Sequence, residues 1–312
     1  MKVVTDHFRL AEAVVRVDWQ DEGLRAVLGA ALAHRAGPPA EAALHLTVRT
    51  RYDWPPPGEA GRVLADGTRG FSIMDPGRQV ASRLDAAGTV AEFACRGLAA
   101  LPAYERAAPF RLILQRWLPS VGRHMLHAGA VGLPGRGAVL FAARGGGGKS
   151  NTTLACLRSP LQVLGEDFLA VDEGPVPRVW SLYSTAKLHA RDLGRFPALA
   201  ADIGDGCDDI DGKALLQLAP RHAAHFTDGL PLRAILVLRV TDRPKSRIVP
   251  APAGEAVKEM LTSLLMALPE SRRPLFEVVT RLAQRLPVHR LELGADLPGI
   301  PGVIADFLER SP

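Results

Sequence analysis

Four consecutive glycines, 145–148, separate two segments whose residue patterns are typical of regular secondary structure. The segment before them, Ala138–Ala143, reads AVLFAA, and the residues after Ser150 read NTTLACL. A short apolar run that ends near glycine is typical of a buried strand, and the segment beyond Ser150 favours the start of a helix. Glycine adopts positive φ without steric cost, so the run predicts a tight turn from a buried strand into a helix. Such a unit belongs to a layered α/β fold.

The residues around this turn match a phosphate-binding loop in all but one position. That pattern reads Gly, four residues, Gly, Lys, then Ser or Thr, and Gly148, Lys149 and Ser150 fit it. The first glycine position holds Ala143, which costs little where its φ is negative and about 1 kcal/mol where it is positive. The alternative is a flexible glycine linker before an ordinary helix. The predicted nucleotide-binding residues are Gly145, Gly146, Gly147, Gly148, Lys149, Ser150 and Asn151.

These residue types suit the phosphates of a nucleotide together with Mg²⁺. Successive backbone N–H groups and the positive end of the following helix dipole would cradle the phosphates. Lys149 would supply a point charge to the outer phosphates, and the Ser150 hydroxyl would bind Mg²⁺.

The charge of the chain restricts its partners. A net charge of +5 and a pI near 9.4 favour an anionic partner. The positive charge is carried mainly by scattered arginines, so a solvated arginine-rich surface is the simpler interpretation. No basic run contains interleaved aromatic residues, and we therefore expect no nucleic-acid partner.

The sequence predicts a cytoplasmic protein. Cys95, Cys156 and Cys207 are an odd number at wide spacing, which suits a reducing compartment better than a disulfide framework. The N-terminal residues MKVVTDHFRL lack the apolar core of a signal peptide. No apolar run approaches the roughly 20 residues that span a bilayer, so we expect no membrane partner.

We expect two domains. Residues 1–108 form a small α+β domain without a recognisable motif, and residues 109–312 form the domain that carries the glycine loop. In the first domain, alternation of apolar and polar residues predicts strands over 7–19 and 45–54, and helical spacing predicts a helix over 23–37. Three prolines predict a rigid loop over 53–62. Residues 78–95 are expected to form two strands around a turn.

The second domain opens with a predicted amphipathic helix over 108–125. Residues 161–172 read as one strand ending in acids, and helices are expected near 253–268 and 273–286. Further strands are expected over 126–134, 137–143, 176–189, 231–241, 245–251 and 288–294, with a last helix over 302–310.

Glu166 and Asp167 lie one helix beyond the glycine loop. Beside a bound triphosphate, one carboxylate can hold Mg²⁺ and the other can accept a proton from an attacking hydroxyl. The alternative is a solvated corner at the end of a strand. His127, near the start of an earlier strand, is either part of this site or an ordinary core histidine. Neither His124 with His127 nor His222 with His225 has further ligands at metal spacing, so we expect no transition-metal site.

Three segments together resemble a known family. LHAGAV, GAVLFAARGGGGKSNTTLACL and LGEDFLAV are similar to the catalytic domain of HPr serine kinase/phosphorylase, and SLYSTAKL extends the likeness to the HPr-kinase-like proteins of lasso-peptide clusters. The resemblance covers about 125–243. It implies a P-loop kinase domain of the HPr kinase/PEP carboxykinase type, preceded here by the small α+β domain. It also implies ATP- and Mg²⁺-dependent phosphoryl transfer to a hydroxyl.

Carried across by motif, the resemblance implies roles for individual residues. Lys149 and Ser150 would hold phosphates and metal, and His127 would orient or neutralise the transferring phosphate. The family's acidic pair is usually Asp-Asp, whereas this chain has Glu166 and Asp167, so either could be the base. The predicted catalytic residues are His127, Lys149, Glu166 and Asp167, and the predicted metal ligands are Ser150 and Asp167.

The resemblance to lasso-cluster proteins suggests an acceptor, the C-terminal serine hydroxyl of a precursor peptide. Transferring phosphate needs more than one positive group, and Lys187 and Lys213 are the further candidates. Three alternatives stay open, namely a small-molecule kinase, a regulator that binds ATP without transfer, and a reverse phosphorylase activity. A homo-oligomer is compatible with the family.

Overall fold

The computed structural model describes residues 3–50, 63–65, 71–75, 80–204, 213–267 and 272–311. The chain divides into two compact units, Met1–Gly122 and Arg123–Pro312. The first unit therefore extends beyond the expected boundary at residue 108. The reason is helix α3 (Arg111–Trp117), which packs on strand β6 (Val80–Leu84) and buries Ile113, Leu114 and Trp117. The helix that we expected to open the second domain belongs to the first.

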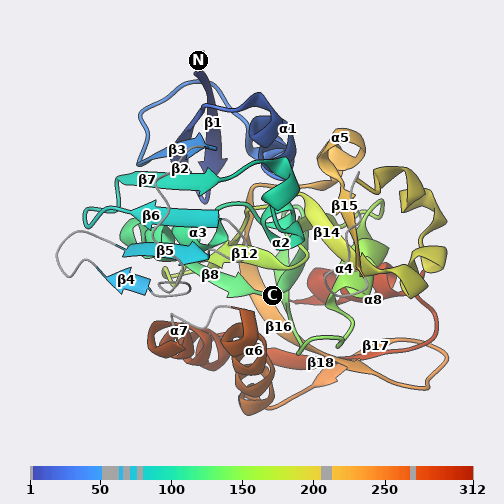
Figure 1. The fold of residues 1–312 in the computed structure, drawn as a ribbon. Coiled ribbons are helices and arrows are strands. Elements are labelled where there is room, and N and C mark those ends of the chain that lie inside the picture. The colour runs from blue at the N-terminus through green and yellow to red at the C-terminus, as the bar shows by residue number, and fades with distance from the viewer. Residues whose placement is uncertain are drawn as a thin grey trace. The chain divides into compact units, whose positions relative to one another are not determined.

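The first unit contains one mixed sheet, in the order β1-β2-β3-β7-β6-β5-β4 (Figure 1). Strand β2 pairs in parallel with β3, and β3 with β7, while the other neighbours are antiparallel. Besides β6, its strands are β1 (Val4–Leu10), β2 (Ala13–Trp19), β3 (Leu44–Arg49), β4 (Val63–Ala65), β5 (Phe71–Asp75) and β7 (Val90–Cys95).

One expectation for this sheet is wrong. Residues 7–19 do not form a single strand, because the chain reverses at Ala11 and Glu12, whose φ values are 49° and 71°. The two strands around the Ala-Ala-Gly turn are confirmed as β6 and β7. The expected loop over 53–62 lies outside the described residues.

The helices of the first unit begin with α1 (Glu22–Ala30), which confirms the helix expected near 23–37. Asp21 caps it, since its carboxylate accepts a hydrogen bond of 2.8 Å from the Leu24 N–H. The others are α2 (Ala103–Ala107) and α3, with 3₁₀ turns η1 (Ala33–Arg35), η2 (Leu98–Ala100) and η3 (Leu118–Val121).

The second unit is built on a larger mixed sheet, in which β10 pairs in parallel with β16, and β16 with β18. A separate ribbon pairs β14 with β15. The strands are β8 (His124–His127), β9 (Gly129–Leu133), β10 (Gly137–Ala142), β11 (Gln162–Gly165), β12 (Phe168–Val171), β13 (Arg178–Ser181), β14 (Thr185–His189), β15 (Lys213–Gln217), β16 (Gly229–Val240), β17 (Arg247–Pro250) and β18 (Val288–Leu293). This arrangement is a mixed α/β fold.

Helices cover this sheet in two groups (Figure 1). Helix α4 (Lys149–Cys156) packs on β9, β11 and helix α8 (Ile300–Arg310), while α6 (Ala253–Ala267) packs on β8, β10, β16 and α7 (Arg272–Arg285). Alternate residues of β10, Val139 and Phe141, join an apolar cluster with Leu154 of α4 and Ile304 of α8. The remaining short elements are α5 (Ala219–His222), η4 (Ala190–Arg195), η5 (Pro197–Asp202) and η6 (Ala223–His225).

The strand expected over 161–172 is interrupted at its acids. Gly165 pairs with Ala130 and Phe168 pairs with His127, so β11 is antiparallel to β9 and β12 is antiparallel to β8. Glu166 and Asp167 lie at the break between β11 and β12. The acids therefore lie directly after the end of β11, as the sequence predicts, and directly before a second paired strand, β12.

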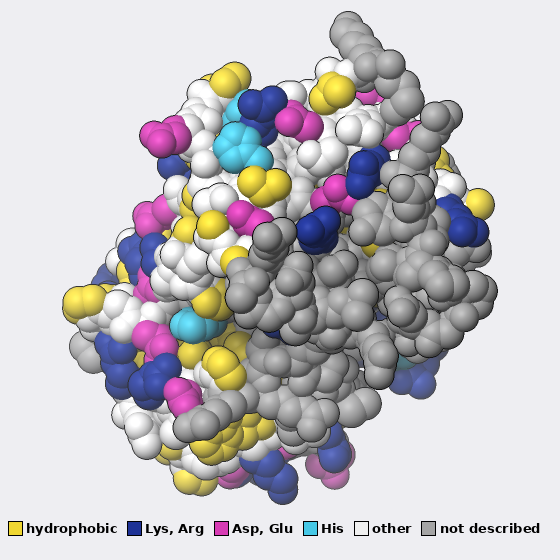
Figure 2. All heavy atoms as spheres, turned by 60° about the vertical axis from the view of Figure 1, so that its left-hand side comes forward, with side chains coloured by type: hydrophobic (Ala, Val, Ile, Leu, Met, Phe, Trp, Pro, Cys, Tyr) yellow, Lys and Arg dark blue, Asp and Glu magenta, His cyan; other side chains and the backbone are white. Residues whose placement is uncertain are grey.

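The surface carries mixed charge. On the face drawn in Figure 2, Lys and Arg side chains lie among Asp and Glu side chains. Exposed pairs such as Arg281 with Glu173, at 2.7 Å between Nε and Oε1, contribute to this pattern. In the part of the chain that the structure describes, no helix is both long enough and apolar enough to cross a membrane.

Candidate functional site

The glycine loop connects β10 to α4, as the sequence predicts. Gly146 and Gly148 have φ values of 75° and 97°, where a side chain would be strained, and the Gly147 N–H donates to the Arg144 carbonyl at 3.0 Å. Ala143 is buried and is not among the described residues with positive φ. An alanine in the first glycine position therefore costs this loop little.

Lys149 is buried and points back into the loop. Its Nζ donates to the Ala143 carbonyl at 2.6 Å and lies 3.5 Å from the Ser263 Oγ. Burial lowers the pKa of Lys149, while the nearby charges of Asp167 and Glu166 act in the opposite direction. The ammonium is thus held by neutral oxygens at the position where the loop would present it to an anion.

Glu166 is the acid that contacts Ser150. The Ser150 hydroxyl donates to one carboxylate oxygen of Glu166, and the Lys187 N–H donates to the other at 3.1 Å. Burial, and after it the charge of Asp167, raises the pKa of Glu166. From sequence we paired Ser150 with Asp167 as metal ligands, whereas the structure places Glu166 beside Ser150. Glu166 follows β11 directly, and its side chain extends toward α4.

Asp167 is held between the imidazole of His127 and the ammonium of Lys187. One oxygen lies 2.6 Å from Nε2 of His127, and the other lies 2.7 Å from Nζ of Lys187. Burial alone would raise the pKa of Asp167, but the charges and hydrogen bonds of His127 and Lys187 outweigh it and hold the pKa well below its usual range. Asp167 is therefore ionised at neutral pH.

The β14–β15 ribbon brings three basic side chains to the site. His189 pairs directly with Lys213 across the ribbon, and Lys187 lies two residues before His189 on the same strand. Side chains two apart in a strand share a face, and all three residues line one cavity. Sequence reasoning identified Lys187 and Lys213 but missed His189, which the alternation of KLH could have revealed.

Helix α6 supplies two polar residues that sequence reasoning also missed. The Ser263 Oγ lies 2.8 Å from Nδ1 of His127, and Glu259 accepts a hydrogen bond of 3.0 Å from the Arg144 N–H. Both side chains are buried on a helix whose other buried residues include Met260 and Leu264. A serine and a glutamate four residues apart on an apolar face are the signal that could have found them.

The glycine loop, the two acids, His127 and the basic residues of the ribbon line one cavity of about 230 Å³, whereas Ser263 and Glu259 lie behind its wall. The buried Oδ1 of Asn151, on its wall, has no hydrogen-bond partner among the described residues. Sequence reasoning did not anticipate Arg144, Arg191, Asp192 or Val240 there. The structure brings together every predicted site residue, namely His127, Gly145, Gly146, Gly147, Gly148, Lys149, Ser150, Asn151, Glu166, Asp167, Lys187 and Lys213.

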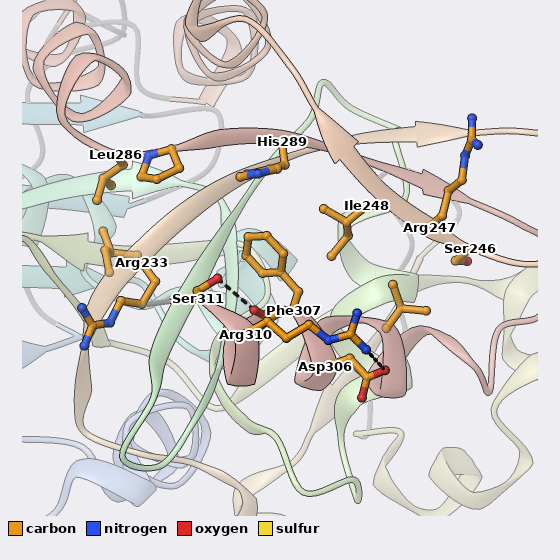
Figure 3. Close-up of a pocket in the computed structure, with 13 residues that line it drawn as sticks. Arg233, Ser246, Arg247, Ile248, Leu286, His289, Asp306, Phe307, Arg310 and Ser311 are labelled. Atoms are coloured by element: carbon orange, nitrogen blue, oxygen red, sulfur yellow. Dashed lines mark hydrogen bonds and ion pairs between the residues drawn. The ribbon is translucent and has the colours of Figure 1, made fainter.

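A larger hollow of about 700 Å³ lies elsewhere in the second unit, where β16 and β18 begin (Figure 3). Its wall includes the ring of Phe307, which meets the ring of His289 edge-on at 4.9 Å between centroids. Arg310 pairs with Asp306 at 3.4 Å, as the dashed line in Figure 3 shows. The hollow has no glycine loop, and the smaller cavity is therefore the candidate phosphate site.

Comparisons with known proteins add little. No protein-family model matches the chain, and a search of curated proteins finds no match. Among solved structures, the chain is similar to the Hpr(Ser) kinase/phosphatase from Coxiella burnetii, with 11% sequence identity and a TM-score of 0.32. The similarity covers 59% of this chain and 95% of that chain. A score of this size does not establish a common fold.

Proposed function

We propose that the second unit is an ATP-dependent kinase that transfers the γ-phosphoryl group to a hydroxyl. The observation that carries the proposal is the convergence of Lys149 and Ser150, from the glycine loop, with Glu166, Asp167 and His127 on one cavity. A carboxylate beside a phosphate-type loop serves phosphoryl transfer, which needs positioning and charge stabilisation more than covalent chemistry.

The residues present fit ATP and Mg²⁺. Small ligands usually occupy clefts of ~300–1,000 Å³, so a cavity of about 230 Å³ suits a phosphate chain rather than a whole nucleotide. Ser150 and Glu166 offer hard oxygen ligands, which Mg²⁺ prefers, and Mg²⁺ commonly uses one or two carboxylates together with phosphates. Among the described residues, no cluster of three or more His, Cys, Asp or Glu side chains is arranged to hold a metal.

When bound, ATP with Mg²⁺ would supply the phosphoryl group and neutralise part of its charge. Lys149 would turn from the Ala143 carbonyl toward the outer phosphates. The loop N–H groups and the first turn of α4 would bind the inner phosphates. Ser150 and Glu166 would hold the metal, and Lys187 and Lys213 would balance charge on the acceptor side.

Asp167 is the residue best placed to accept the acceptor's proton. It is ionised, and His127 and Lys187 fix both of its oxygens. The acceptor oxygen would bond to phosphorus as the bond to ADP breaks, and its proton would pass to Asp167. In a loose transition state the protein contributes positioning and charge stabilisation more than covalent chemistry, so a weak base at this position can serve.

The proposed acceptor is the C-terminal serine hydroxyl of a lasso-type precursor peptide. This choice rests on the resemblance of GGGGKSNTTLACL, LGEDFLAV and SLYSTAKL to the kinases of lasso-peptide clusters. A small-molecule hydroxyl would use the same residues, and acceptor screening separates the two.

Intact-mass analysis tests the proposal directly. A lasso-type precursor peptide is incubated with the protein, ATP and Mg²⁺, beside a copy whose last serine is alanine. A gain of one phosphate on the first peptide alone supports the peptide kinase. If the protein binds ATP but neither peptide gains a phosphate, the C-terminal serine is not the acceptor. A regulator that binds ATP without transfer would then be favoured, because His127 and Lys187 already contact both carboxylate oxygens of Asp167.

A further inference from the structure

The ring of His127 is held on both sides. Its Nε2 lies 2.6 Å from Asp167, and its Nδ1 lies 2.8 Å from the Oγ and 3.3 Å from the carbonyl oxygen of Ser263. The ring of Phe168 stacks beside it at 5.0 Å between centroids. Three neighbours thus define the plane and direction of the imidazole, and Ser263 is the one that comes from a distant helix.

Ser263 also reaches the glycine loop. Its Oγ lies 3.5 Å from Nζ of Lys149, which can only donate, so this oxygen accepts from the ammonium and contacts the imidazole as well. One turn earlier on α6, Glu259 binds the backbone N–H of Arg144 at the start of the loop and the guanidinium of Arg239 at 2.9 Å. One face of α6 therefore supports both the loop and the histidine.

We propose that Ser263 is a positioning residue, which fixes the orientation of the His127 ring so that Nε2 faces Asp167. A serine hydroxyl has one proton and two lone pairs, so it can complete the bonding of Nδ1 whichever nitrogen carries the proton. Without it, Nδ1 keeps only the longer contact to the Ser263 carbonyl. For catalysis this inference rests on the proposed function, but the ring orientation does not.

The chain offers a matched control beside Ser263. Thr262 is exposed, and its hydroxyl donates only to the Lys258 carbonyl at 2.8 Å within the same helix. Thr262→Ala removes a hydroxyl from α6 without touching the site. Ser263→Thr keeps the hydroxyl at the site and serves as the rescue variant.

The first readout is the imidazole ¹⁵N spectrum of histidine-labelled protein, with His127 assigned from the loss of its signals in His127→Gln. Ser263→Ala should shift or broaden the His127 ring signals, whereas Thr262→Ala should leave them at their wild-type positions. Unchanged His127 signals in a folded Ser263→Ala protein would overturn the proposal. This readout needs neither nucleotide nor turnover.

The second readout is turnover with the phosphate-accepting peptide. Ser263→Ala should lower kcat about ten-fold, as expected for one lost hydrogen bond, and leave KM for ATP within about two-fold. Ser263→Thr should restore most of kcat. Wild-type kcat in Ser263→Ala would overturn the catalytic part of the proposal. If the wild-type protein itself transfers no phosphate, the proposed function fails, and the ring signals still decide the role of Ser263.

Discussion

Asp167 and His127 meet across two neighbouring strands, with 2.6 Å between a carboxylate oxygen and Nε2. Phe168, directly after Asp167, pairs with His127 in the β8–β12 ladder, so the contact is fixed by backbone pairing. The acid is therefore presented to the cavity by the sheet, and its removal should affect chemistry more than folding.

Asp167→Asn should lower kcat about 10³-fold, because an amide keeps the shape but cannot accept the acceptor's proton. The affinity for ATP should change little, since Asp167 does not contact the glycine loop. Single-turnover assays and calorimetric ATP binding measure the two effects. Wild-type turnover by the purified variant would remove Asp167 from the mechanism.

Lys149→Ala should lower kcat/KM by at least about 10²-fold, because the loop loses the charge that it presents to the phosphates. Lys245→Ala is the control, since Lys245 is exposed and lies outside the cavity. Circular dichroism verifies folding of both variants. Equal activity of the two lysine variants would contradict the site.

Glu166→Gln should raise the Mg²⁺ concentration for half-maximal rate about ten-fold, since the amide keeps a contact with Ser150 but is a poorer ligand than a carboxylate. The exposed Glu309→Gln is the matched control. Rates are measured against Mg²⁺ at saturating ATP. An unaltered Mg²⁺ dependence would instead favour Asp167 as the metal ligand, as the sequence alone suggested.

Gly148→Ala should destabilise the second unit by about 1–3 kcal/mol. Gly148 has φ of 97°, and an added Cβ would lie 2.8 Å from Cδ1 of Leu293. Gly145→Ala is the control, because that position has ordinary φ and no atom within 4 Å of an added Cβ. Urea unfolding compares them, and equal stabilities would contradict the loop conformation.

Glu105 gives the first unit a pH-dependent stability. It is buried, its carboxylate accepts from the Phe110 N–H at 3.1 Å, and burial raises its pKa to about 7. The raised pKa means that its contribution is fully present below its unfolded pKa near 4.5 and is lost as the pH rises through about 7. Relative to Glu105→Gln, the free energy of unfolding should fall by about 3 kcal/mol from pH 4.5 to pH 8. Urea titrations at the two pH values measure it, and parallel curves would show that Glu105 stays accessible to water.

Local sequence was enough to predict the strand, glycine turn and helix around Lys149. Apolar runs, glycines and helical spacing determine secondary structure within a few residues. The bounds of β10 and α4 therefore lie close to the positions where these sequence patterns change. Most of the later strands and helices of the second unit follow for the same reason.

Features that depend on distant pairing could not be predicted. The break at Glu166 and Asp167 depends on where β8 and β9 pair with that segment, which the segment itself does not encode. Ser263 lies 136 residues from His127 in the chain, and only the packing of α6 brings them together. The reversal at Ala11 and Glu12 was missed because neither residue is a usual turn former.

The break between β11 and β12 has a consequence for rate. Because paired strands hold both flanks of Glu166 and Asp167, the two carboxylates are ordered once, when the sheet folds. A loop carrying the same acids would lose conformational entropy in every catalytic cycle, by about 1–2 kcal/mol for each backbone residue fixed. The sheet thus removes a recurring entropic barrier at these two carboxylates.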